Sequence, residues 1–464
     1  MDSTVTAESQ TRYSPPVQKA KTSRLSLKAL SGRGVLAIVD QGFISGSNFI
    51  ISIVLARTLT PRDYGVYALG FEVFLLLSVL YGCLVLEPMS VFGASLYREH
   101  AQEYLGSVLR IHTVASVVML VGIAACAWVA HVVAPASNLP STLAGVSLAG
   151  PVVLLFWLAR RAFYMKLSSQ GAVAGAGAYF AVLMVGLFAI HKWNLLSPFS
   201  AFLLMAAGAA IAAASMLWTL RPRLRTGHAY VHAKEVVRQH WIYGRWALAS
   251  AIPNWFSGAM YYPLLGHYSG MAEAGKLKAL MNLTSPVAQV FVAISLLSLP
   301  YASHIYHQDG ARSTNRLVGR LTLLYGGGSA LYWIVLIAIR GPVVHSLYGA
   351  KYAVIIGLLP WIALGSILRI AATAQANILR AMRLPALVCG VYTTAGLVGI
   401  AVGVPAIWLY GIKGAVVTFV IAGATACAAA TVTILRRSSK HRGEEVESGA
   451  ESAGREEASI VAGA

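Results

Sequence analysis

Apolar residues fall along most of the chain in blocks of about 18 to 25 residues, which short polar stretches separate. At 1.5 Å per residue, a helix of this length crosses a hydrocarbon core of about 30 Å. The pattern predicts an all-α polytopic membrane protein with about twelve transmembrane helices. The predicted spans cover residues 35–55, 65–86, 108–132, 141–159, 172–190, 198–220, 246–266, 279–300, 320–339, 353–372, 385–406 and 414–435.

Composition excludes two broad classes of protein. Hydrophobic residues make up 57% of the chain, charged residues make up 11%, and the mean hydropathy is +0.67. A soluble globular enzyme carries more charge than this, and a disordered chain carries far fewer apolar residues. The four cysteines lie inside apolar blocks and form no CxxC pair, so neither a disulfide framework nor a metal site is expected.

The net charge of +19 predicts an orientation in the membrane rather than a nucleic-acid partner. Lys and Arg occur in short clusters between the apolar blocks, as in loops that flank membrane spans. With twelve spans, 28 of the 36 Lys and Arg fall on the side that holds both termini, and 8 fall on the other side. Because cytoplasmic loops carry the excess of Lys and Arg, both termini are predicted to be cytoplasmic.

The chain divides into two predicted helical units with polar segments around them. The first and last segments are expected to be disordered cytoplasmic tails, basic and acidic respectively, and a basic cytoplasmic linker joins two six-helix bundles. The predicted parts are the tail 1–33, the bundle 34–220, the linker 221–245, the bundle 246–435 and the tail 436–464.

The two bundles contain similar segments at similar places. ARTLTPRDYGVYALG after the first block resembles GHYSGMAEAGKLKAL after the seventh, with Gly65 and Gly275 in register. RRAFYMKL after the fourth block likewise resembles ILRAMRL after the tenth. A duplicated six-helix unit is typical of transporters whose halves move about a central site.

Several segments resemble a known superfamily. DQGFISGSNFIISIVLARTLTPRDYGVYAL is similar to the first-span signature of bacterial polysaccharide and oligosaccharide flippases, which belong to the multidrug, oligosaccharidyl-lipid and polysaccharide exporter superfamily. The segments that agree with it are LYGAKYAVIIGLLPWIALG, ILRAMRLPAL and LYGIKGAVVTFVIAG. The resemblance covers nearly the whole chain between the tails, and it rests on Gly/Ala/Leu patterns rather than on catalytic signatures.

This resemblance implies two six-helix bundles around a central cavity that opens alternately to each side of the membrane. The implied cargo is a polyprenyl-diphosphate-linked oligosaccharide, which is flipped across the bacterial inner membrane for exopolysaccharide, capsule or O-antigen biosynthesis. The implied partners are this substrate and membrane lipids, with polysaccharide polymerase and export machinery as further candidates. No cofactor is implied, and coupling to H⁺ or Na⁺ is left open.

Polar residues in the first predicted span are candidates to line that cavity. Asp40, Gln41 and Asn48 form a polar stripe, and Gln41 and Asn48 share a helix face with Ser45 between them. Ionisable groups inside a membrane are costly and therefore mark functional sites by default. The alternative is a helix-packing surface, because a GxxxG motif at 42–46 adjoins the stripe.

Charged residues at the ends of spans form a second group of candidates. Glu72 in the second span could carry a coupling proton or pair with a cavity cation, or it could form a structural pair with Arg57. Arg57, Lys276 and Lys278 occupy related positions in the two bundles, where they could attract diphosphate or anchor the helices at the interface. The remaining candidates, both expected to hydrogen-bond sugar hydroxyls, are Asn254 and Asn282.

Two other functions compete with a flippase. A polytopic glycan polymerase or transferase usually needs a large extramembrane loop or a carboxylate cluster, and the sequence has neither these nor a DxD, Walker, HExxH or GxSxG motif. An ion-coupled drug exporter of the same superfamily is the closer alternative. Between residues 34 and 435, however, 25 Lys and Arg accompany nine acids, a balance that favours an anionic cargo over a cationic drug.

Overall fold

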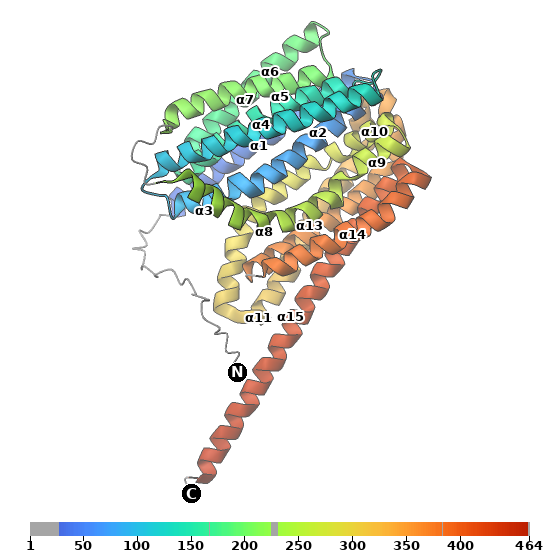
Figure 1. Cartoon of the computed structure of the whole chain (residues 1–464). Helices are drawn as coiled ribbons and strands as arrows, with labels where there is room; N and C mark the ends of the chain where they lie inside the picture. Colours follow the sequence, from blue (N-terminus) through green and yellow to red (C-terminus); the bar gives the residue numbers. More distant parts are fainter. Residues whose placement is uncertain (1–26, 167, 224–230, 383, 463–464) are drawn as a thin grey trace, which may run out of the picture.

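The computed structural model describes residues 27–166, 168–223, 231–382 and 384–462, and regular structure in these residues is helical (Figure 1). The helices of the first half are α1 (Leu27–Thr58), α2 (Pro61–Tyr81), the π-helix η1 (Gly82–Leu86), α3 (Glu87–Ala94), α4 (Ala101–Val133), α5 (Leu139–Met165), α6 (Ser169–Lys192) and α7 (Pro198–Leu220). Those of the second half are α8 (Ala233–Ala259), α9 (Tyr261–Tyr268), α10 (Met271–Asn282), α11 (Ser285–Ala338), α12 (Arg340–Tyr348), the 3₁₀-helix η2 (Ala350–Leu358), α13 (Leu359–Ala381), α14 (Pro385–Tyr410) and α15 (Ile412–Ala462).

The predicted all-α membrane fold is confirmed, with a smaller number of spans than the sequence indicated. Ten helices in the described ranges are long and apolar enough to cross a membrane, and the bent pair Met271–Asn282 and Ser285–Ser295 makes an eleventh span if it is counted as one. The predicted seventh span, 246–266, corresponds to the end of α8 and most of α9, which are not among them. A second difference is that α11 continues as one helix through the predicted loop between 300 and 320.

Most of the packing takes place within each half of the chain (Figure 1). In the first half α5 packs against α4 and α7, and α6 packs against α1 and α7. In the second half α13 packs against α11 and α15, and α14 packs against α8 and α15. The halves meet where α2 contacts α9 and α10, and where α1 contacts α11 and α12.

Two clusters of buried apolar side chains show at which end the halves are joined. The larger cluster combines the first half with one end of the second half, represented by Leu277 of α10, Trp333 of α11 and Ile407 of α14. The smaller cluster stays within the second half and includes Phe291 and Tyr325 of α11. The halves therefore share a hydrophobic core near α10 and α12, whereas the other end of the second half has a core of its own.

The joined end is closed by a backbone contact between α2 and α10. Thr60 caps the start of α2, with its hydroxyl accepting from the Asp63 amide at 3.1 Å, and Gly270 (φ +91) precedes α10. A Cβ atom on Gly275 would lie 2.9 Å from the Gly65 nitrogen, and one on Gly65 would lie 3.0 Å from the Gly275 nitrogen. The two segments whose similarity marked the repeat thus face each other in a nearly symmetrical contact.

At the other end, α8 is attached to the first half beside the π-helix η1. The ring of His240 hydrogen-bonds the Tyr104 hydroxyl at 2.8 Å and the Leu84 carbonyl at 3.1 Å. A Cβ atom on Gly244 would lie 2.8 Å from the Cys83 carbonyl oxygen, so the two backbones are close there as well. Because π-helices break the regular hydrogen-bond pattern, η1 is a natural place for a carbonyl to accept from another helix.

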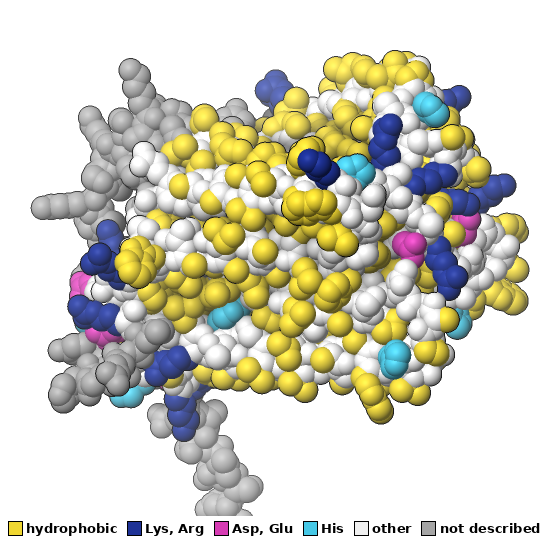
Figure 2. All heavy atoms as spheres, turned by 90° about the horizontal axis from the view of Figure 1, so that it is seen from above, with side chains coloured by type: hydrophobic (Ala, Val, Ile, Leu, Met, Phe, Trp, Pro, Cys, Tyr) yellow, Lys and Arg dark blue, Asp and Glu magenta, His cyan; other side chains and the backbone are white. Residues whose placement is uncertain are grey.

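The outer surface is suited to lipid. Figure 2 shows hydrophobic side chains over the middle of the visible face, with most Lys and Arg toward its two ends. Large apolar side chains on α4, α6 and α7 are exposed, among them Val118, Trp128, Phe188 and Trp218. Exposed apolar helices of this length bury their surface in a bilayer.

Candidate functional site

Three hollows adjoin one another along α1, between the two halves. We call the one between α1 and α5 the Arg160 chamber; its volume is 460 Å³. The lateral groove, of 340 Å³, lies between α1 and the first part of α11. The deep chamber, of 180 Å³, lies among α1, α2, α10 and α11. Gln41 lines the Arg160 chamber and the lateral groove, and Gln289 lines the lateral groove and the deep chamber.

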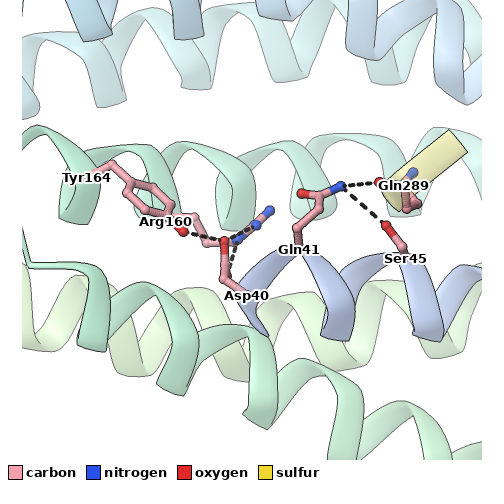
Figure 3. A network of polar contacts seen from close by, with 6 residues as sticks. All are labelled: Asp40, Gln41, Ser45, Arg160, Tyr164 and Gln289. Carbon is pink, nitrogen blue, oxygen red and sulfur yellow. Dashed lines mark hydrogen bonds and ion pairs between the residues drawn. The ribbon is translucent and has the colours of Figure 1, made fainter. Parts of the chain in front are cut away.

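The Arg160 chamber contains an ion pair between α1 and α5 (Figure 3). Arg160 Nε donates to Asp40 Oδ1 at 3.1 Å, and the Tyr164 hydroxyl donates to Asp40 Oδ2 at 2.7 Å. Asp40 is only 2% exposed, so its charge depends on these partners. Arg161 also lines the chamber; its acidic neighbour among the described residues is Glu87, which lies beyond ion-pair distance but interacts with it electrostatically. The lining, with two guanidinium groups and one carboxylate, carries a net positive charge, and Glu87 lies outside the lining beside Arg161.

The polar stripe of α1 lies along the hollows. Gln41 Nε2 donates to Ser45 Oγ and to Gln289 Oε1, both at 3.2 Å, and the second bond joins the two halves (Figure 3). Ser45 and Asn48 line the deep chamber. The helix-packing alternative finds no support, because a Cβ atom on Gly42 would meet no other atom within 4 Å and one on Gly46 would meet its nearest atom at 3.9 Å.

A second ion pair joins the halves beside the deep chamber. Lys278 Nζ of α10 lies 3.3 Å from Glu72 Oε1 of α2, and the two side chains are 12% and 9% exposed. The ammonium group also lies 4.4 Å from the centroid of the Phe71 ring and 5.4 Å from that of Tyr262, so cation–π attraction adds to the pair. Glu72 therefore pairs with a cation of the cavity wall, and the alternative of a pair with Arg57 is wrong.

Uncharged polar groups supply most of the remaining polar lining of the deep chamber. Asn282 is buried and its Nδ2 donates to the Tyr348 hydroxyl at 3.4 Å, a long hydrogen bond. Asn48 and Ser285 make no side-chain hydrogen bond to a described residue, so their polar groups are available to a ligand. The uncharged polar side chains of the lining are Ser45, Asn48, Ser52, Asn282, Ser285 and Gln289.

Arg57 and Lys276, two candidates from the sequence, do not line these hollows. Arg57 is exposed and donates to the backbone carbonyl of Ser346 in α12, at the closed end. Lys276 pairs with Glu273 on its own helix, with Nζ and Oε1 2.6 Å apart. Both therefore act in joining or stabilising helices in this structure. The side chain of Asn254 lies outside the described residues.

Four residues of the hollows were not predicted from the sequence, namely Arg160, Arg161, Tyr164 and Gln289. The arginine pair follows the fourth apolar block, so its charges were assigned to a cytoplasmic loop, whereas α5 continues to Met165 and carries both into the bundle. Asp40, the partner of Arg160, is 120 residues away in the chain. The available signal was a carboxylate inside the first span, which requires a buried cation somewhere in the fold.

The arrangement offers groups that can bind an anion and an apolar chain. In the described ranges, no three His, Cys, Asp or Glu side chains come together as ligands for a metal ion. The carboxylates of Asp40 and Glu72 are engaged by Arg160 and Lys278. The three hollows are a positive chamber, an apolar groove and a small polar chamber. The Gly65–Gly275 contact closes the end of the space between the halves in which they lie.

Membrane-crossing helices around partly open hollows form an architecture that solved membrane transport proteins share. An inward-facing multidrug resistance MATE family transporter of the MOP superfamily has a TM-score of 0.72 and 10% identity, covering 87% of this chain and 96% of that one. The lipid II flippase MurJ in an inward closed conformation has a TM-score of 0.63 and 14% identity, covering 87% of both chains. A eukaryotic MATE transporter, AtDTX14, has a TM-score of 0.58 and 12% identity, covering 90% and 98%. At these identities the comparisons establish the fold alone.

The sequence itself identifies the family. Residues 54–357, more than half of the chain, match the family described as polysaccharide biosynthesis protein, and the chain belongs to that family. The resemblance noted from the segments of the first and tenth spans is thereby confirmed. No curated protein matches the sequence.

Proposed function

We propose that this chain translocates a polyprenyl-diphosphate-linked oligosaccharide across the bacterial inner membrane by alternating access, for exopolysaccharide, capsule or O-antigen biosynthesis. The observation that carries the proposal is the Arg160 chamber, a positive space that adjoins an apolar groove. Guanidinium groups bind phosphate oxygens through paired, charge-assisted hydrogen bonds, and a polyprenyl tail requires apolar surroundings. Membership of the polysaccharide biosynthesis family supports a glycan cargo.

Alternating access requires that one end of the cavity be closed while the other is accessible. The shared core and the Gly65–Gly275 contact close one end in this conformation. With both termini in the cytoplasm, as the distribution of Lys and Arg predicts, the closed end faces the periplasm and the Arg160 chamber lies toward the cytoplasmic leaflet. The cargo would then enter from the leaflet in which lipid-linked oligosaccharides are assembled.

The likeness to MATE transporters favours a second candidate, an exporter of small molecules. Transport of cationic compounds needs carboxylates that are free to pair with the cargo. Here Asp40 and Glu72 already pair with Arg160 and Lys278, and Arg161 remains as an additional positive charge. The charge balance of the described hollows therefore supports an anionic cargo.

Deletion of the gene tests the proposal and separates the two candidates. We expect complete lipid-linked repeat units to accumulate in the cytoplasmic leaflet while surface glycan disappears, as measured by metabolic labelling and mass analysis. Restoration by the wild-type gene is the control. Unchanged lipid-linked intermediates together with new sensitivity to toxic cations would overturn the flippase proposal in favour of drug export.

A further inference from the structure

The deep chamber differs in chemistry from the Arg160 chamber, although both lie between the halves. Its polar lining consists of hydroxyl and amide groups together with the ammonium group of Lys278. Rings of Phe49, Tyr67 and Phe71 form part of its wall. Amides and hydroxyls match the alternating donors and acceptors of sugar hydroxyls, and aromatic rings pack against the C–H faces of a sugar.

The charge of the deep chamber is balanced. Glu72 lies 3.3 Å from Lys278 across the helix contact, and both side chains are at least about nine-tenths buried. An uncharged ligand leaves this balance intact. An acidic ligand would add an uncompensated negative charge near Glu72 in a space largely shielded from water, which is strongly unfavourable.

The position of the deep chamber relates it to the chamber proposed for the diphosphate. Asp40 and Asn48 are eight residues apart on the same helix, which corresponds to about 12 Å along its axis. Gln41, bonded to both Ser45 and Gln289, connects the two regions with a continuous row of polar groups. A volume of 180 Å³ suits one sugar ring and excludes a larger part of an oligosaccharide.

We propose that the deep chamber binds one uncharged sugar ring of the cargo, within two sugars of the diphosphate, and that the Glu72–Lys278 pair excludes acidic sugars from it. Asn48, Asn282 and Ser285 supply hydrogen bonds to the ring, and the aromatic wall supplies packing. This inference rests on the proposed function, because it assumes that the Arg160 chamber holds the diphosphate.

Binding to three synthetic probes tests the inference with the full-length protein in lipid nanodiscs. The probes are farnesyl diphosphate, farnesyl diphosphate carrying two glucose residues, and the same molecule carrying two glucuronic acid residues. We expect the glucose probe to bind about tenfold more tightly than farnesyl diphosphate, as one or two additional net hydrogen bonds provide. The glucuronic acid probe should show no such gain.

Variants distinguish the role of each group. Asn48→Leu and Asn282→Leu should abolish the gain for the glucose probe and leave binding of farnesyl diphosphate unchanged. Glu72→Gln should raise affinity for the glucuronic acid probe, because Lys278 then lacks its counter-charge. Gln170→Leu, in a separate hollow beside α7, is the matched control and should change nothing.

The outcomes separate this inference from the proposed function. Failure of farnesyl diphosphate itself to bind the wild-type protein would contradict the proposed function. Tight binding of farnesyl diphosphate with an equal affinity for the glucose probe would overturn the sugar subsite alone. If Glu72→Gln does not fold, the two asparagine variants still test the sugar subsite. It would also be overturned if both variants bound the glucose probe as much more tightly than farnesyl diphosphate as the wild type does.

Discussion

At the scale of single residues, the charge of the Arg160 chamber comes from Asp40, Arg160 and Arg161. Asp40 and Arg160 would each be costly alone inside a membrane bundle, and together they form two hydrogen-bonded contacts that Tyr164 extends. The pair holds Arg160 at the chamber wall, while Arg161 contributes a second positive charge to the lining. Cargo phosphates would therefore compete with the Asp40 carboxylate for Arg160, and with the more distant Glu87 carboxylate for Arg161.

A double-mutant cycle measures this pair. Asp40→Asn leaves Arg160 without its counter-charge and Arg160→Met leaves Asp40 without its own, so each single variant should be less stable than the wild type. The double variant should be less destabilised than the sum, with a coupling energy of about 0.5–3 kcal/mol from thermal unfolding in detergent. Additive effects would show that the two side chains do not interact in the folded protein.

At the scale of helices, the crossing of α2 and α10 controls the closed end. Its two glycines allow backbone contact, and the ion pair of Glu72 with Lys278 follows on the same two helices. The contact between α2 and α10 thus combines two glycines that close the cavity with an ion pair whose Lys278 lines the deep chamber.

Gly275→Ala should weaken this closure. The added methyl group would clash with the Pro61 carbonyl and the Gly65 nitrogen, forcing the helices apart at a cost of about 1–3 kcal/mol. Labelling of a cysteine introduced at Ser52, in the deep chamber, by a membrane-impermeant thiol reagent from the outside should increase. Gly122→Ala in α4, where the methyl group meets no atom within 4 Å, is the control; equal labelling in both variants would contradict this role of the crossing.

The helices were largely predictable from the sequence because a long apolar block indicates a segment that crosses the membrane. The sixth predicted span, 198–220, matches α7 as a whole, and the repeat around Gly65 and Gly275 was visible as a sequence similarity. Contacts between helices were not predictable, because they depend on how distant segments meet. The sequence offered Arg57 as a partner for Glu72, whereas folding brings Lys278 from 206 residues away. Likewise Arg160 resembled a loop residue until its partner was known.

At the scale of the whole molecule, the loops assigned to one side of the membrane lie together in the structure. Asn138 after α4 donates to Asp63 at the start of α2 at 2.6 Å, and both belong to predicted outside loops. The Arg223 amide donates to the Gln102 carbonyl at 3.2 Å, and both belong to predicted inside loops. The alternation derived from counting Lys and Arg is therefore consistent with the packing of the first half.

Reporter fusions test this orientation. Green fluorescent protein attached after Ala464 should fluoresce, because the C-terminus is expected in the cytoplasm, and alkaline phosphatase inserted after Asn138 should be active, because that loop is expected outside. Phosphatase inserted after Arg223 is the matched control and should be inactive. The reverse pattern would invert the topology and place the closed end toward the cytoplasm.

The central claim is that this protein moves a diphosphate-linked glycan across the membrane and that the positive charge of the Arg160 chamber binds the diphosphate. Its most direct test is the rate at which labelled polyprenyl-diphosphate-linked oligosaccharide changes leaflets in liposomes that contain the purified protein. Arg161→Ala removes a chamber charge that lies beyond ion-pair distance of its acidic neighbour Glu87, and it should slow transfer about tenfold or more, as loss of a hydrogen bond to a charged group predicts. Arg340→Ala, at the exposed start of α12, should leave the rate unchanged. Equal rates for wild type and Arg161→Ala, or no transfer by the wild type, would contradict the account.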